Sequence, residues 1–195
     1  MTAERWVRTV EDARVFVRSA GLCLIFKASG AERGGRYPAL WDVVDAPDKR
    51  PGEHGFGERD ALVWRLKNEL PLSYPDEVYY GKLAGGRAML CTLERLTELY
   101  RAQYREAGTL SRDAQRLLAL IAGRPISNKD LRLDSGLHTP EARSRFERAL
   151  QELQVSFQIA RVDVEPDTWF PFAAVYPAIA ARSVTPAPAA RSPRA

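Results

Sequence analysis

Between residues 111 and 155 the apolar positions recur at the spacing of amphipathic helices. Three helices are expected there. The first begins after the capping residue Ser111, the second after Ser127, and the third at Thr139, which is followed by a proline suited to the first helical position. Gly136 fits the position just beyond the end of the second helix. The expected buried faces comprise Ala114, Leu117, Leu118, Ile121, Leu131, Ala142, Phe146, Ala149, Leu150 and Leu153.

Two segments with strand-like apolar patterns follow the third helix, at residues 157–164 and 169–176, with a turn at 165–168 between them. The order of helix, short helix, longer helix and hairpin within about 70 residues is typical of a winged helix. We therefore predict a winged-helix domain over residues 109–182. The segment 183–195 contains three prolines and no bulky apolar residue beyond Val184, so a disordered tail is expected.

The N-terminal 108 residues have weaker periodicities, which predict an α+β region. A helix capped by Thr9 ends at Gly21, and a second helix capped by Thr92 runs to about residue 106. The other expected elements are a buried segment 22–26, a loop 30–35, an apolar patch 40–44, an exposed loop 45–60, a segment 62–70 that ends at Pro71, and a hairpin of 78–83 with 89–93. The pattern also fits a second, degenerate winged helix. The predicted fold class is α+β, with the winged helix packed on the N-terminal region.

The composition is that of a soluble protein with one large or two small domains. The chain has 195 residues, of which 45% are hydrophobic. Because it contains neither an apolar run of about 18 residues nor a secretory signal, we expect a cytoplasmic protein without membrane contact. Cys23 and Cys91 lie in apolar surroundings and have no second ligand at short spacing, so they are interpreted as buried free thiols. No metal or other cofactor is predicted.

The net charge is spread so evenly that neither the N-terminal nor the C-terminal half is strongly basic. The net charge is +4, with +1 in residues 1–108, +1 in 109–182 and the rest in Arg191 and Arg194. A surface for duplex DNA must therefore come from the arrangement of side chains on and around the third helix of the winged helix, whose N-terminal residues would enter the major groove. The candidate nucleic-acid contacts are Lys129, Arg132, His138, Thr139, Arg143, Ser144, Arg145, Arg148 and Arg161.

The same helix is also compatible with a face that binds protein. Three glutamates on it balance three arginines, and Arg143 and Glu147 are spaced four apart, as in an ion pair on a solvated helix. His138, just before the cap, could donate to phosphate or simply form the turn. These two interpretations of the surface remain open at this point.

Several apolar and aromatic motifs resemble those of the AlkZ-related family. They are Arg-Trp-Val-Arg-Thr-Val-Glu-Asp-Ala-Arg from Arg5, Leu-Cys-Leu-Ile-Phe from Leu22, Ala-Leu-Trp-Asp-Val-Val from Ala39, Trp-Arg-Leu-Lys-Asn-Glu-Leu-Pro from Trp64 and Tyr-Tyr-Gly-Lys-Leu from Tyr79. The resemblance covers roughly residues 5–180. This group is similar to, but shorter than, the AlkZ/YcaQ winged-helix DNA glycosylases, which remove alkylated or crosslinked bases. The resemblance thus implies a winged-helix fold and contact with DNA.

The catalytic motif of those glycosylases is absent. Their two glutamines, or a glutamine and an aspartate, are separated by one residue, whereas Gln151 and Gln154 are three apart here. No catalytic residue is therefore assigned. Lys67, Glu69, Tyr79, Tyr80 and Lys82 could form a substitute site, with a carboxylate as general base or aromatic rings that stack a base, but we favour their packing into a core.

The function predicted from the sequence is DNA binding without catalysis, in regulation or in damage recognition. A divergent glycosylase acting on alkylated or crosslinked bases is the first alternative, and an adaptor that binds a protein partner is the second.

Overall fold

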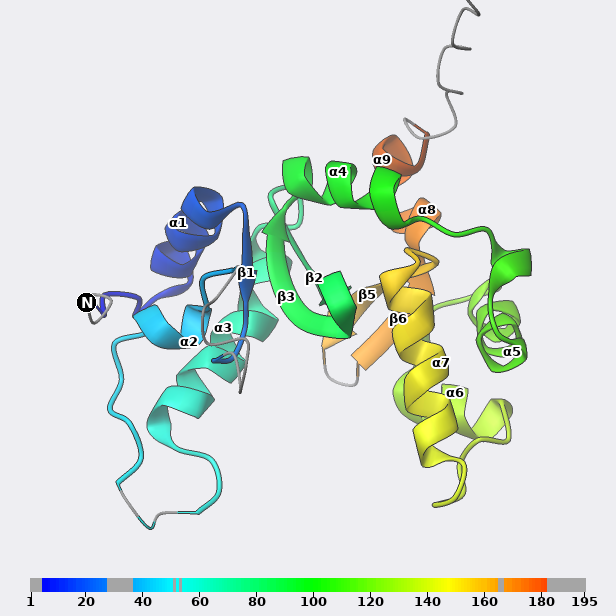
Figure 1. Ribbon diagram of the computed structural model, residues 1–195, viewed down its shortest axis with the longest axis horizontal. Helices are drawn as coiled ribbons and strands as arrows, with labels where there is room; N and C mark the ends of the chain where they lie inside the picture. The colour runs from blue at the N-terminus through cyan, green and yellow to red at the C-terminus, as the bar shows by residue number, and fades with distance from the viewer. Residues whose placement is uncertain (1–4, 28–36, 51, 53, 165–166, 182–195) are drawn as a thin grey trace, which may run out of the picture.

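The computed structural model describes residues 5–27, 37–50, 52, 54–164 and 167–181. Within these ranges the chain forms two units of helices and strands, each with a three-stranded antiparallel sheet (Figure 1). The α+β class expected from the sequence is therefore confirmed. The expected loop 30–35, the turn residues 165–166 and the expected tail 183–195 lie outside the described residues.

The first unit has the order helix, strand, helix, helix, strand, strand. Its sheet has the strand order β1-β3-β2, so the last strand is central, and Leu90 in it lies opposite Cys23 on one side and Tyr80 on the other. The elements are α1 (Val10–Ala20), β1 (Leu22–Leu24), α2 (Leu40–Val43), α3 (Glu58–Ser73), β2 (Val78–Leu83) and β3 (Arg87–Thr92).

The second unit repeats this order along the chain. Its sheet has the order β4-β6-β5, in which the central Trp169 lies opposite Ile126 and Arg161. The elements are α5 (Arg112–Ile121), β4 (Ile126–Ser127), α6 (Asn128–Asp134), α7 (Arg143–Val155), β5 (Ile159–Val164) and β6 (Asp167–Pro171). In position along the unit, α2 corresponds to α6 and α3 corresponds to α7. The helices and the hairpin follow the order that the sequence predicts for residues 109–182, but the expected second strand 169–176 was wrong beyond residue 171, where α8 begins.

Short elements join and complete the two units. Thr92 caps α4 (Leu93–Gln103) by accepting a hydrogen bond from the backbone N–H of Arg95, and α4 leads toward the second unit. After β6 come α8 (Phe172–Val175) and α9 (Pro177–Ala181), and α9 packs against α4. Two 3₁₀ turns, η2 (Ala84–Gly86) and η3 (Ala107–Thr109), complete the described elements.

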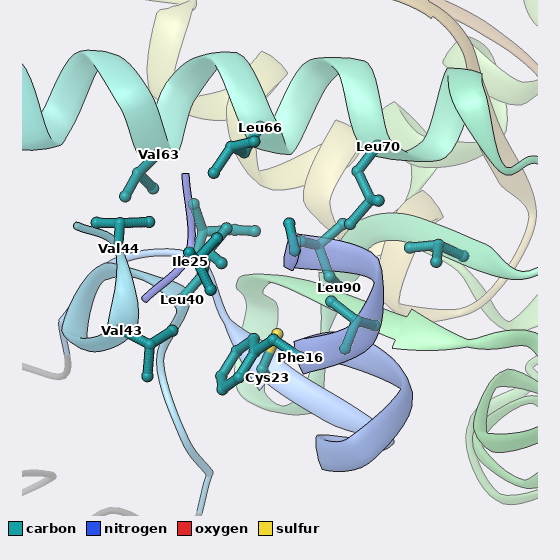
Figure 2. Close-up of a cluster of buried hydrophobic side chains, with 14 residues drawn as sticks. Phe16, Cys23, Ile25, Leu40, Val43, Val44, Val63, Leu66, Leu70 and Leu90 are labelled. Atoms are coloured by element: carbon teal, nitrogen blue, oxygen red, sulfur yellow. The ribbon is translucent and has the colours of Figure 1, made fainter. Parts of the chain in front are cut away.

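Three clusters of buried side chains hold the structure together. One lies between α1, α2, α3 and the first sheet (Figure 2), and one lies within the second unit beneath α5, α6 and α7. The third draws on both units, since it includes Tyr79 and Met89 of the first sheet together with Phe157 and Phe172 of the second unit. We call this third cluster the shared core. Its rings contact one another, as Phe172 does with Tyr100 at a centroid separation of 5.2 Å.

The two cysteines are free and buried, as the sequence predicts. Leu22, the neighbour of Cys23 on β1, lies opposite Cys91 of β3. Because successive side chains of a strand point to opposite faces, Cys23 lies in the cluster beneath α1 and Cys91 lies in the shared core. Burial raises the pKa of the Cys23 thiol to about 12 and also raises the pKa of Cys91.

Several expected helix termini were wrong, and α4 for example ends at Gln103 rather than near residue 106. α3 continues through Pro71 to Ser73, because a proline in the last turn removes one backbone donor there while Tyr74 still donates to the Leu70 carbonyl (3.0 Å). α7 begins at Arg143 rather than at Thr139. Thr139 accepts from the backbone N–H of Ala142 (3.3 Å), and it caps a single turn that precedes the helix.

Candidate nucleic-acid interface

A groove of about 470 Å³ lies between α6 and α7, at the end of the second unit where α7 begins (Figure 1). Four of the nine nucleic-acid contacts predicted from the sequence line it. The lining residues are Asn128, Lys129, Arg132, Leu133, His138, Arg143, Phe146 and Glu147. The turn between the two helices therefore gathers residues that are up to 19 positions apart in the sequence into one surface, which we call the α6–α7 groove.

Lys129 and Arg143 are the free cations of this groove. Lys129 lies in the first turn of α6, and Arg143 is the first residue of α7. Both side chains are exposed, and neither has an ion-pair or hydrogen-bond partner within the described ranges. Both positive charges are consequently available to an anionic ligand.

Arg132 is held inside the same groove by residues of α7. Its Nη2 atom lies 2.7 Å from a carboxylate oxygen of Glu147, and its guanidinium stands over the Phe146 ring at 4.8 Å. Since one third of the side chain remains exposed, the guanidinium can still donate outward. Arg132 thus links α6 to α7 and also contributes to the surface.

Arg145 and Arg148 lie on α7 outside the groove. Arg145 donates two hydrogen bonds to Asp113 of α5, at 3.0 and 2.8 Å, and this carboxylate raises the pKa of the guanidinium. Arg148 donates only to the backbone carbonyl of Ser144 (3.2 Å) and has no carboxylate partner in the described part of the chain. Of these two arginines, Arg148 is the more available to a ligand.

The polar residues before and within the first turn of α7 are exposed. His138 lines the groove, and Ser144 lies in the first turn of the helix. The Thr139 side chain also hydrogen-bonds with Glu141, whose pKa is lowered first by its own backbone N–H and then by Thr139. An ionised Glu141 near this end partly offsets the positive charge of the groove.

Arg161 does not lie on this surface. Its side chain is 4% exposed, and its Nη1 atom contacts Asp167 (3.2 Å) and Asn68 of α3 (3.3 Å). Its guanidinium also stands 4.1 Å from the centre of the Tyr80 ring. The first unit covers this face of β5, so Arg161 cannot reach a nucleic acid and we remove it from the candidate contacts.

The five residues considered as a substitute catalytic site do not converge. Tyr79 and Tyr80 are neighbours on β2 and face opposite sides of the sheet, so Tyr79 lies in the shared core while Tyr80 faces Lys67 and Arg161. The Lys82 Nζ atom donates to Gln151 of α7 (3.4 Å). These contacts support packing rather than general acid–base chemistry.

Asn128 is a groove residue that the sequence reasoning missed. It follows the cap Ser127, and its side-chain oxygen accepts a hydrogen bond from Nε1 of Trp169 (2.6 Å), which ties the start of α6 to β6. The polar side chain just after a cap was visible in the sequence. Its partner, 41 residues further along, was not.

Within the described ranges the structure offers no cluster of three or more histidine, cysteine, aspartate or glutamate side chains that could hold a metal ion. The helices in the same ranges are too short or too polar to cross a bilayer.

Comparison with known proteins identifies a family. No curated protein and no solved structure matches the chain. The family model described as "AlkZ related" matches residues 7–168, which include the whole first sheet, the α6–α7 groove and the second sheet as far as the start of β6. The chain therefore belongs to the AlkZ-related family.

Proposed function

We propose that residues 112–171 form a winged helix that binds duplex DNA without catalysing a reaction on it. The N-terminal end of α7 enters the major groove, and the α6–α7 groove faces the phosphate backbone. Membership of the AlkZ-related family supports this proposal, because it relates the chain to DNA glycosylase-like proteins.

The observation that carries the proposal is the pair of free, exposed cations on two different helices. Lys129 lies in the first turn of α6 and Arg143 begins α7, and both line one groove without a carboxylate partner in the described ranges. Most other arginines of the unit are already paired, Arg145 with Asp113 for example. A helix N-terminus also presents unpaired backbone N–H groups that favour phosphate.

The chemistry of the two side chains suits different parts of a duplex. The planar fork of Arg143 can donate two parallel hydrogen bonds to the edge of a guanine or to a phosphate. Lys129 acts as a point charge and is suited to a phosphate oxygen. If each neutralises one phosphate, each contributes about 0.9 to the slope of log affinity against log salt.

The glutamines of α7 support a role without catalysis. The Gln154 side-chain oxygen accepts from the backbone N–H of Lys82 (3.2 Å), and this side chain is only 3% exposed. The Gln151 oxygen accepts from the Lys82 ammonium group. Both side-chain oxygens thus join α7 to β2, and Gln154 is buried away from a ligand.

The test is fluorescence anisotropy of a labelled duplex over a salt titration. We expect salt-sensitive binding that weakens about tenfold, or about 1.4 kcal/mol, for Arg143→Gln and for Lys129→Gln. The control is Arg101→Gln on α4, which removes one exposed arginine that does not line the α6–α7 groove and should leave the affinity unchanged.

Two results would contradict the proposal. One is equal affinity of the wild type and both groove variants, which would mean that the duplex contacts another surface. The other is a lack of binding at low salt, which would favour an adaptor that uses this groove for a protein.

A further inference from the structure

A second hollow, of about 390 Å³, lies on the outer side of α3, the helix that corresponds in position to α7. It is bounded by the segment before α3, by α3 itself and by the end of β5. The lining residues are Phe56, Ala61, Trp64, Arg65, Asn68, Glu69, Leu72 and Val164. Its volume falls within the range of ligand sites, about 300 to 1,000 Å³. We call it the α3 pocket.

Two exposed aromatic rings form a corner of the α3 pocket. Phe56 is 66% exposed and Trp64 is 47% exposed, and their ring planes meet at 82° with centroids 5.9 Å apart. Leu72, also on α3, adds a further exposed apolar side chain. A planar ring stacked on Trp64 would therefore also meet Phe56.

Lys67 supports the Trp64 ring from within the protein. Its ammonium group lies over that ring at 3.7 Å from the centroid, and the lysine side chain is 5% exposed. Phe26 lies beside the same indole, at a centroid separation of 6.4 Å, and almost half of Trp64 remains exposed to a ligand. The contact with Lys67 holds Trp64 in place without filling the pocket.

The pocket also presents one hydrogen-bond donor and one acceptor without partners. Arg161 donates to the side-chain oxygen of Asn68 (3.3 Å), and because a guanidinium can only donate, the amide nitrogen of Asn68 is left facing elsewhere. Neither this nitrogen nor the Glu69 carboxylate has a partner in the part of the chain that the structure describes. Arg65 and Glu69 balance in charge, which favours a neutral ligand over an anion.

We propose that the α3 pocket binds an unpaired nucleobase of a DNA strand. The base stacks on Trp64 beside Phe56, accepts a hydrogen bond from the Asn68 amide and donates one to Glu69. The proposal rests on the DNA binding proposed for α7. In addition, the first unit would select duplexes in which one unpaired base has left the base stack of the DNA.

The experiment compares two labelled duplexes that differ only by a single bulged base. Stacking of one base on an aromatic side chain predicts that the wild type binds the bulged duplex roughly 5- to 150-fold more tightly. Trp64→Ala should abolish this preference and keep the affinity for the paired duplex. The matched control is Trp6→Ala, since Trp6 is 38% exposed and lies outside the pocket; it should keep both affinities.

Asn68→Asp is a milder variant that keeps an acceptor for Arg161 and removes the donor to the base. It should reduce the preference while the protein stays folded, as checked by circular dichroism. The proposal is overturned if the wild type binds both duplexes equally, or if Trp64→Ala keeps the preference.

Failure of the α7 proposal can be told apart from failure of this one. Arg143→Gln should weaken both duplexes by the same factor. If no duplex binds, a short single-stranded oligonucleotide still tests the pocket through tryptophan fluorescence. Quenching that disappears in Trp64→Phe supports the pocket, and quenching that is absent or unchanged in that variant overturns it.

Discussion

Lys67 is a buried cation without a carboxylate partner in the described ranges, and its replacement by methionine should stabilise the protein. The side chain is 5% exposed. Its pKa is lowered from 10.5 to about 8, first by burial and then by repulsion from Arg161, with a smaller opposing effect of Asp167. Methionine has a similar length and no charge, so it fills the same space without the cost of burying an ammonium group.

The magnitude follows from the pKa and from the contact with Trp64. Lowering the pKa from 10.5 to about 8 corresponds to about 3 kcal/mol in favour of the neutral amine. The substitution also loses the attraction between the ammonium and the Trp64 ring, about 1 to 2 kcal/mol. The free energy of unfolding at pH 7 should therefore rise by about 1 to 2 kcal/mol, and Tm by about 2 to 8 °C for a chain of this size.

The pH dependence gives this prediction its own signature. Below pH 8 Lys67 is protonated in both the folded and the unfolded protein, so the full cost is present. Between pH 8 and 10.5 the folded protein releases the proton first, and the cost disappears. The wild type should therefore approach Lys67→Met in stability over this range. Taking the difference between the two proteins cancels other groups that titrate there, such as the two thiols.

Urea unfolding of both proteins at pH 7 and at pH 10 is the assay. A variant less stable than the wild type at pH 7 would show that the ring contact outweighs the burial cost. A difference that stays constant with pH would show that Lys67 does not titrate as argued.

Two further predictions concern residues at the junction of the units. Arg161→Met should leave the duplex affinity and its salt dependence unchanged when measured by anisotropy, because the guanidinium is buried against Tyr80 and Asp167. A tenfold loss of affinity would show that Arg161 contacts the DNA after all. Phe157→Gly removes the strain of a positive φ of 56°, a gain in stability of about 1 kcal/mol. It also removes a ring that is 1% exposed in the shared core, which costs about 3 to 5 kcal/mol. We expect a net loss of about 2 to 4 kcal/mol in urea unfolding, and an unchanged midpoint would refute the importance of that ring.

Local signals in the sequence sufficed for most helix starts and for the first hairpin. Thr9, Thr92, Ser111 and Ser127 were recognised as caps because each satisfies backbone N–H groups within its own turn. The start of α3 was missed, since residues 45–60 have the composition of an exposed loop. There the backbone N–H of Gly57 donates to Asp60 (3.0 Å), a local contact that begins the helix within that segment.

The candidate sites were less accessible to sequence reasoning because they depend on contacts between distant segments. Lys129 and Arg143 were named from helix positions alone, and the structure places them in one groove. Arg161 was named from its place in the first strand of the expected hairpin, but its exposure depends on α3, where Asn68 lies 93 residues earlier in the chain. Trp64 stood out in the sequence only as the first residue of a motif that resembles the AlkZ-related family, and its place in a pocket depends on the segment before α3.

Because of the shared core, the two units repeat one order of elements but do not have independent stabilities. Tyr79 and Met89 of one unit belong to the same buried cluster as Phe157 and Phe172 of the other unit. A chain cut near residue 108 would leave both halves of this cluster facing water. The whole described structure should therefore melt in one cooperative transition, and a mutation in either unit should lower the stability of both.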